Sequence, residues 1–228
     1  YHDREPAGTA REAAGLRELG LAGMKMKVGR APYAQDVERI QAAKEAGGEG
    51  FAVAVDVNQG WSVEQSLDFC SRAAGLGLAW LEEPVKWYDC LTGLARVRAA
   101  SAIPIVSGQG DISEFRSMDL VRYGAVDQLN TDATLVGGIS GWMNVAAFAA
   151  EHGVAMGHHE EPQVSLTLLS VVEKIGPVEI FANPERDPLW RKIVANPPLP
   201  RDGFLEVPQG PGLGLDLDWA TIERHAKR

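Results

Sequence analysis

Residues 51–84, FAVAVDVNQGWSVEQSLDFCSRAAGLGLAWLEEP, contain the pattern that decides the fold. The apolar runs Phe51–Val57 and Leu78–Leu81 are typical of buried strands, and the segment Val63–Ala74 between them has the spacing of an amphipathic helix. Strand, helix and strand in this order predict two parallel strands joined by a right-handed crossover.

The same alternation extends in both directions along the chain. Further strands are predicted at Leu21–Val28, Ile103–Val106, Ala125–Leu129, Val154–Met156 and Val178–Phe181. Further helices are predicted at Ala10–Leu19, Gln35–Ala46, Leu91–Ala99, Ser113–Tyr123, Ser140–Glu151 and Pro162–Lys174. Ser62 and Gln65 form a candidate capping box, and Gly153 suits a helix end. Seven strands without a doubly wound break favour an α/β fold of the (β/α)-barrel, or TIM, type. Eight strands close such a barrel, so we expect the first strand to be missing from these residues.

The chain is expected to divide into two parts. Residues 1–196 are predicted to form one catalytic barrel. After Asn196 the composition turns to Pro, Gly and Leu, which predicts an irregular C-terminal arm at residues 197–228. A short helix is expected near Trp219–His225 at the end of that arm.

Composition and charge restrict the class of protein. A length of 228 residues with 45% hydrophobic side chains can bury a sizeable core. The net charge of -9 argues against nucleic-acid partners, which require clustered Lys and Arg. No apolar run has the length of a membrane helix, and no signal-peptide core is visible at the N-terminus. The two cysteines, Cys70 and Cys90, have no metal-site spacing, so reduced structural thiols in a cytoplasmic protein are expected.

Polar side chains recur at the ends of successive predicted strands. The series is Lys27, Asp56, Glu82, Gln109 or Asp111, Asp132 and His159, with steps of 29, 26, 27, 23 and 27 residues when counted through Gln109. One strand-helix unit of a barrel takes about 25–30 residues. These side chains are therefore expected at one height, at the carboxyl ends of the strands, where barrel enzymes build their active sites.

Three positions in this series are candidate metal ligands. Asp56, Glu82 and either Gln109 or Asp111 would supply oxygen atoms from neighbouring strands, which suits a hard cation such as Mg²⁺. A single acidic residue at such a place is as often a helix N-cap. The adjacent carboxylates of Glu82 and Glu83 follow a buried run, however, and would be costly there without a cation. Asn58 can face the same side as Asp56 and support it.

Lys25 and Lys27 are candidate acid-base groups. They are two residues apart on one strand, so both side chains point to one face, while Met24 and Met26 point to the other. Two inward lysines near a metal are expected to lower each other's pKa by like-charge repulsion, which would make a general base near neutral pH. The alternative places both lysines in solvent at the outer surface.

Asp132 and His159 are the second candidate acid-base pair. A carboxylate that orients an imidazole is a common arrangement in catalysis. His158 adjoins His159, and one of these two histidines could instead be a structural residue. Asp127 stands at the start of its strand and is interpreted as structural.

Five motifs together resemble the mandelate racemase and muconate lactonizing enzyme branch of the enolase superfamily. They are Lys25-Met26-Lys27, Asp56-Val57-Asn58, Trp80-Leu81-Glu82-Glu83-Pro84, Asn130-Thr131-Asp132 with Gly137-Gly138-Ile139-Ser140-Gly141-Trp142, and Met156-Gly157-His158-His159. The resemblance implies a modified (β/α)7β-like barrel, one Mg²⁺ per active site and a homo-oligomer such as an octamer. It also implies an N-terminal capping domain that these residues lack. The C-terminal arm is expected to pack either on the barrel or on that capping domain.

The resemblance also implies roles for individual residues. Lys27 resembles the base on one face and Lys25 the neighbour that polarises the substrate carboxylate. Asp56 and Glu82 resemble the first two metal ligands, and Asp132 with His159 resembles the dyad on the opposite face.

The sequence departs from the family pattern at the third metal ligand. The family has a Glu where this chain has Gln109. Asp111, which carries a charge, is the preferred replacement for that Glu, and both Gln109 and Asp111 stay candidates. Glu179 is a candidate for the later Glu that donates a hydrogen bond to the substrate carboxylate.

The resulting hypothesis is a Mg²⁺-dependent acid-sugar dehydratase. It would remove the proton alpha to the carboxylate, pass through an ene-diolate and eliminate the beta hydroxyl as water, giving a 2-keto-3-deoxy acid. One alternative is a racemase or epimerase of a 2-hydroxy acid. Another is a phosphate-binding barrel, suggested by the glycine-rich segment at residues 137–141. A degenerate, non-catalytic relative is the third, because Gln109 removes one charge from the metal site and the capping domain is expected to be missing.

Overall fold

Six parallel strands form one sheet in the computed structural model, which describes residues 5–183, 185–186 and 188–226. The strands are β1 (Gly23–Lys27), β2 (Ala52–Asp56), β3 (Leu81–Glu82), β4 (Ile105–Ser107), β5 (Gln128–Asn130) and β6 (Ala155–Gly157). Each strand pairs with the one before it in sequence, so the sheet order is β1-β2-β3-β4-β5-β6. The last residues of the first three strands are in register, with Lys27 opposite Asp56 and Asp56 opposite Glu82.

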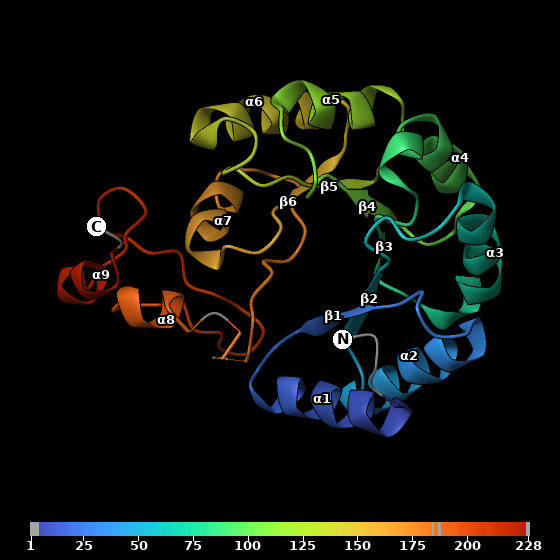
Figure 1. Ribbon diagram of the computed structural model, residues 1–228, viewed down its shortest axis with the longest axis horizontal. Coiled ribbons are helices and arrows are strands. Elements are labelled where there is room, and N and C mark those ends of the chain that lie inside the picture. The colour runs from blue at the N-terminus through green and yellow to red at the C-terminus, as the bar shows by residue number, and fades with distance from the viewer. Residues whose placement is uncertain (1–4, 184, 187, 227–228) are drawn as a thin grey trace.

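A helix follows or precedes each strand and lies outside the curved sheet (Figure 1). The helices of this layer are α1 (Pro6–Glu18), α2 (Tyr33–Gly47), α3 (Val63–Ala73), α4 (Thr92–Ala100), α5 (Glu114–Arg122), α6 (Gly138–Glu151) and α7 (Pro162–Leu169). The short 3-10 helices η1 (Ala74–Leu76) and η2 (Trp87–Asp89) belong to the connections. Parallel strands with helices on their outer face are the arrangement that the sequence predicts, so the α/β barrel-type fold is confirmed.

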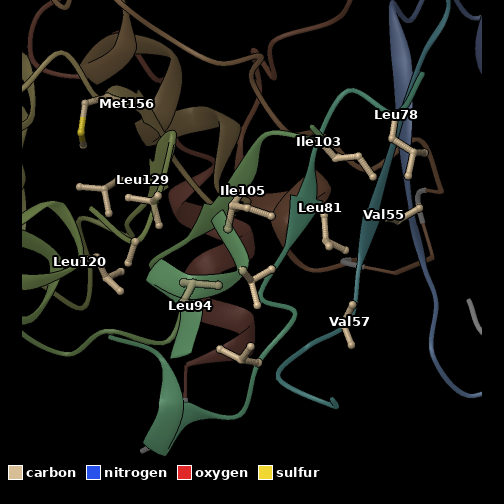
Figure 2. Close-up of a cluster of buried hydrophobic side chains, with 14 of the residues drawn as sticks. Val55, Val57, Leu78, Leu81, Leu94, Ile103, Ile105, Leu120, Leu129 and Met156 are labelled. Atoms are coloured by element: carbon tan, nitrogen blue, oxygen red, sulfur yellow. The ribbon is translucent and has the colours of Figure 1, made fainter. Parts of the chain in front are cut away.

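The buried apolar core lies between the strands and these helices. Val55, Leu81, Ile105 and Leu129, from four adjacent strands, are fully shielded from solvent. Figure 2 shows these side chains together with helix residues such as Leu94. Because successive strand residues point to opposite faces, the neighbours of these core residues in sequence point to the inner face of the sheet.

The seventh predicted strand, Val178–Phe181, is wrong, because these residues form no strand. The chain instead meets β6 earlier, through a parallel bridge between Met156 and Ile175. After Gly176, whose N–H donates to the Met156 carbonyl at 2.8 Å, residues 177–181 form no strand. The helix predicted at Pro162–Lys174 also ends early, at Leu169, because the residues after it turn toward β6.

Local signals at two helix ends are confirmed. The Ser62 hydroxyl accepts a hydrogen bond from the Gln65 N–H at 3.2 Å, and the Gln65 side chain accepts one from the Ser62 N–H at 2.8 Å. Gly153 has a φ of 68° after α6, a left-handed conformation that glycine adopts without strain. Asp127 is structural as interpreted, since it accepts from the Ile105 N–H and pairs with Arg98.

A buried ion pair holds the end of β1. Asp36 and Arg39 of α2 are 2% and 1% exposed, and the Arg39 guanidinium donates to Asp36 at 2.8 Å and to the Lys27 carbonyl at 3.2 Å. The other Asp36 oxygen accepts from the Gly29 N–H at 2.8 Å. Helix α2 is therefore hydrogen-bonded to the backbone at two places, at Lys27, the last residue of β1, and at Gly29, two residues further along the chain.

Helix α8 (Trp190–Ile193) lies just before the C-terminal arm, and α9 (Trp219–His225) lies within it. Helix α9 has the bounds predicted from the sequence, and Asp218 caps its first turn. The Gly203 N–H donates to the Gly20 carbonyl at 2.6 Å, so the arm contacts the turn between α1 and β1. No helix within the described residues combines the length with the apolar composition that a bilayer-spanning segment needs.

Candidate active site

The six positions of the sequence series lie at one edge of the sheet. Three of them are the last residues of β1, β2 and β3, and the other three stand two residues beyond β4, β5 and β6. They are Lys27, Asp56, Glu82, Gln109, Asp132 and His159. Because all six strands are parallel, their carboxyl ends share this edge.

Two lysines and two carboxylates form a buried cluster on the inner face of β1–β3. Lys25 Nζ donates to both oxygens of Glu82, at 2.9 and 3.0 Å, and lies 3.8 Å from Asp56 Oδ2. Lys27 Nζ donates to Asp56 Oδ2 at 2.5 Å. The side chains of Asp56 and Glu82 are fully buried, while that of Lys27 is 31% exposed. The lysines therefore face inward and Met26 faces the core, which removes the alternative of two solvated lysines.

The prediction that the two lysines lower each other's pKa near a metal stays a prediction. Burial lowers the pKa of Lys25, but the nearby charges of Glu82, Glu179 and Asp56 outweigh that effect and raise it above its usual range. Carboxylates lie between the two lysines, so the nearest charges to Lys25 are negative. A divalent cation bound by these carboxylates would withdraw that negative charge from the lysines.

Each buried carboxylate has further donors that fix its orientation. The Asn58 N–H donates to Asp56 Oδ1 at 2.7 Å, and the Asn58 amide donates to Asp56 Oδ2 at 3.3 Å. Trp80 Nε1 donates to Glu82 Oε2 at 2.9 Å. The role of Trp80 is not predicted from the sequence, although its place two residues before Glu82 puts both side chains on one face of the chain.

The side-chain oxygen of Gln109 is buried and has no hydrogen-bond partner. Gln109 Nε2 donates to Glu83 Oε2 at 2.9 Å, and Gln59 Nε2 donates to Glu83 Oε1 at 3.1 Å. This orientation leaves the buried Gln109 Oε1 without a hydrogen bond. Burial raises the pKa of Glu83 to about 7 despite these two donors. Gln59 is a site residue that the sequence analysis missed, although it directly follows Asn58.

Asp111 is directed toward α5 instead. Its carboxylate accepts a hydrogen bond from the Ser117 hydroxyl at 3.4 Å and lies 3.7 Å from the Arg116 guanidinium. Burial raises the pKa of Asp111 to about 6, against the effect of Arg116. The geometry therefore favours Gln109 over Asp111 as the third oxygen donor, which reverses the preference drawn from the sequence.

The donor set suits Mg²⁺ with one neutral ligand. Within the described residues, no three or more His, Cys, Asp and Glu side chains form a group that could hold a metal ion. Two fully buried carboxylates and the unpartnered amide oxygen of Gln109 are nevertheless oxygen donors of the kind that Mg²⁺ prefers. The chemistry of these donors therefore fits a hard cation, which Asp56, Glu82 and Gln109 would hold.

The two adjacent histidines have different environments. His158 is fully buried, its Nε2 accepts from the Ala133 N–H at 3.0 Å, and its Nδ1 is 2.9 Å from the His159 carbonyl. Both of its ring nitrogens are thus engaged by backbone groups. His159 Nδ1 lies 3.2 Å from Asp132 Oδ2, and its side chain is 23% exposed. The structure therefore brings Asp132 to His159, and His158 has the contacts of a structural residue.

A second carboxylate contacts His159 from the other side. Glu160 Oε1 is 3.3 Å from His159 Nε2. Burial lowers the pKa of His159, but hydrogen bonds to Asp132 and Glu160 outweigh that effect and raise it to about 10. His159 therefore carries a proton at neutral pH. Glu160 is a site residue that the sequence pattern does not predict, because neighbouring residues on an extended chain do not usually face each other.

Glu179 reaches the site from the segment that was predicted to be a strand. Its Oε1 lies 3.2 Å from Lys25 Nζ, and its Oε2 accepts from the Glu160 N–H at 3.1 Å. Glu179 thus connects the lysine cluster of β1 with the loop that carries His159.

Left-handed backbone conformations are concentrated at the same edge of the sheet. Of the non-glycine residues with positive φ in the described part of the chain, all but Asp202 lie in the loops that follow β2, β3 and β6. They are Asn58, Gln59, Glu83, Glu160 and Glu161. Each such residue costs about 1–3 kcal/mol, and clusters of them are typical of functional sites.

Comparison with known proteins finds related sequences and similar folds. A family model described as Enolase C-terminal domain-like matches residues 8–221. The L-talarate/galactarate dehydratase of Salmonella typhimurium is 34% identical over 203 residues, which are 88% of this chain and 49% of that protein. A crystal structure of a mandelate racemase/muconate lactonizing enzyme from a marine actinobacterium, in complex with magnesium, is 40% identical with a TM-score of 0.87. That match covers 95% of this chain and 60% of the other.

A second solved structure joins the metal with a sugar acid. The L-talarate dehydratase from Polaromonas sp. JS666, complexed with Mg and L-glucarate, is 28% identical with a TM-score of 0.87, over 98% of this chain and 60% of that chain. Other curated relatives are cycloisomerases, epimerases and racemases. The chain spans about half to three-fifths of the length of these proteins.

Proposed function

Because this chain belongs to the Enolase C-terminal domain-like family, we propose that it is the Mg²⁺-dependent catalytic domain of an acid-sugar dehydratase. The observation that carries the proposal is the order of groups along the sheet edge. The two lysines lie on β1, the oxygen donors lie at or just beyond the ends of β2, β3 and β4, and His159 with its carboxylate partner follows β6. A candidate base and a candidate acid therefore flank a candidate metal site.

Asp56, Glu82 and the amide oxygen of Gln109 would hold the cation. Bound there, Mg²⁺ would balance the buried negative charge and polarise a substrate carboxylate, which acidifies the adjacent C–H bond. Asn58 and Trp80 would keep the two carboxylates in position through the hydrogen bonds described above.

The chain's own residues would then transfer two protons. Lys27 would take the alpha proton, and Lys25, with Glu179, would face the carboxylate oxygens of the resulting ene-diolate. His159, protonated at neutral pH and oriented by Asp132, would donate its proton to the beta hydroxyl as the C–O bond breaks. Water leaves, and the enol product becomes a 2-keto-3-deoxy acid.

A racemase or epimerase of a 2-hydroxy acid is the second candidate. It is favoured by the same residues, since a base on each side of a planar intermediate can return the proton to the opposite face. Epimerases and racemases are among the relatives of this chain. The two reactions differ in whether a beta hydroxyl departs, which follows from the substrate.

Incubation with a set of acid sugars in heavy water, with Mg²⁺ present or removed by chelation, should separate these reactions. For a dehydratase we expect a keto product that carries deuterium. This product should not form when Mg²⁺ is removed. Deuterium in an inverted centre with no keto product would indicate an epimerase. An absence of both exchange and product for every acid sugar, in the complete natural protein with Mg²⁺, would contradict the proposal.

Replacing Gln109 with Glu should tighten Mg²⁺ binding by about tenfold or more, because cation affinity rises with the charge of the ligands. The new carboxylate would also face Glu83, which now accepts a hydrogen bond from Gln109, and the repulsion between them would be relieved when the cation binds. Titration calorimetry with MgCl₂ measures the affinity.

Asp111→Asn is the matched control for this prediction. It removes a charge two residues away, from a side chain that contacts Arg116 and Ser117, so Mg²⁺ affinity should not change. If Asp111→Asn weakened binding more than Gln109→Ala did, Asp111 would be the third ligand.

The phosphate-binding and non-catalytic alternatives have less support. The Gly138 N–H at the start of α6 already donates to the Ala133 carbonyl at 2.8 Å, so this amide does not point at an anion. The non-catalytic alternative depends in part on Gln109, and the amide oxygen of Gln109 is still available to a cation. Assembly into a homo-oligomer such as an octamer stays a prediction.

A further inference from the structure

The proposed acid, His159, is contacted by carboxylates at both ring nitrogens. Asp132 Oδ2 lies 3.2 Å from Nδ1, and Glu160 Oε1 lies 3.3 Å from Nε2. Asp132 suffices to orient the ring and fix its tautomer. The nitrogen that must reach a substrate is therefore the one that Glu160 covers.

The backbone of the loop after β6 is shaped to bring Glu160 back to its neighbour. Glu160 and Glu161 have φ values of 53° and 47°, two consecutive left-handed conformations at residues that are not glycine. The Glu160 N–H is fixed by Glu179, whose other oxygen lies 3.2 Å from Lys25. This strained turn, anchored to the lysine cluster, places the Glu160 side chain beside His159.

Glu160 has a second cationic partner that can retain its charge. Arg186 donates to Glu160 Oε1 at 2.7 Å, a shorter contact than the one with His159, and the Arg186 guanidinium also lies over the Phe181 ring. Glu160 can therefore move away from His159 without losing all of its countercharge. These two contacts, with His159 and Arg186, hold the pKa of Glu160 down to about 2.

We propose that Glu160 is a positioning residue that occupies the Nε2 side of His159 until a substrate hydroxyl takes its place, and that Arg186 holds Glu160 when it withdraws. This inference rests on the proposed function of His159 as the proton donor. It adds a competing internal ligand at that nitrogen, so that His159 stays paired and charged when no substrate is bound.

The first test is the titration of His159 itself, which needs neither metal nor turnover. In Glu160→Gln, measured by imidazole nitrogen NMR on the whole chain, the pKa of His159 should fall by about one unit because a contacting charge is lost. Asp132, Glu179 and Arg186 remain around the ring. The matched control is Glu161→Gln, which removes the same charge one residue on, from a side chain that contacts Thr134. It should leave the pKa of His159 unchanged.

The second test separates competition from a purely structural role. For an acid sugar that the complete protein dehydrates, Glu160→Gln should lower KM, since the substrate no longer displaces a paired carboxylate. Arg186→Met should raise KM, since Glu160 then pairs more strongly with His159. Glu160→Asp keeps the charge but shortens the side chain, and it should lower KM even if Glu160→Gln folds poorly.

The outcomes of the two tests are distinguishable from failure of the proposed function. An unchanged pKa of His159 in Glu160→Gln, or KM values that move in the same direction in Glu160→Asp and Arg186→Met, would overturn this proposal. If His159 titrates as expected but no acid sugar reacts, the contact stands and the dehydratase assignment fails.

Discussion

Replacing Lys27 with Met should slow exchange of the substrate's alpha proton by about a thousandfold, within the range that a positioned acid or base contributes. Lys27 is the lysine whose side chain remains partly exposed, at 31%, while it contacts the buried Asp56. It is therefore the amine that a substrate can reach. The measurement is deuterium incorporation into the acid sugar in heavy water, followed by mass spectrometry, with saturating Mg²⁺.

Lys44→Met is the control for Lys27→Met. Lys44 lies on α2 and donates to the Gly77 carbonyl at 2.8 Å, away from the sheet edge that holds the site. This variant should exchange the proton at the normal rate. If Lys27→Met also exchanged at the normal rate while binding Mg²⁺, Lys27 would not be the base.

Replacing Arg39 with Met should lower the free energy of unfolding by about 3–5 kcal/mol, the usual cost of removing one partner from a buried ion pair. Asp36 of α2 is 2% exposed, and its buried carboxylate would lose the Arg39 guanidinium that pairs with it. The contact from Arg39 to the Lys27 carbonyl would be lost as well, so the end of β1 would be less well held. Urea denaturation followed by circular dichroism measures the change.

Two comparisons test the reason for that loss. Arg72→Met breaks an ion pair with Asp68 in which both side chains are 57% exposed, and such pairs contribute about 0–1 kcal/mol. The double variant Asp36→Leu with Arg39→Met removes both buried charges and should recover much of the stability lost in Arg39→Met. Equal losses in Arg39→Met and Arg72→Met would show that burial of the pair is not what stabilises β1.

Much of the fold could be predicted from local patterns. Six strands, the helices between them and the capping box at Ser62 follow from apolar periodicity and cap residues, which act over a few positions along the chain. The prediction failed at Val178–Phe181, where apolar character suggested a strand. Pairing with β6 occurs at Ile175 instead, and the position of a pairing partner is not encoded in local composition.

The candidate site divides in the same way. The regular spacing of residues from Lys27 to His159 predicts that they share one edge of a parallel sheet, since each strand-helix unit returns the chain to the same height. The spacing does not determine which atoms face each other. The choice between Gln109 and Asp111 depends on side-chain contacts with Glu83 on one side and with Arg116 and Ser117 on the other.

The sequence by itself determined the order of strands and helices and the set of polar residues at the strand ends, because both depend on periodicity along the chain. Only the tertiary structure decided the charge environment of those residues. Lys25 is surrounded by carboxylates from β2, β3 and the residue 178–181 segment, and their charges raise its pKa above its usual range. Glu160 faces His159 because a strained turn folds it back. Electrostatic interactions depend on distances through space, and those distances are set by segments that are far apart in the sequence.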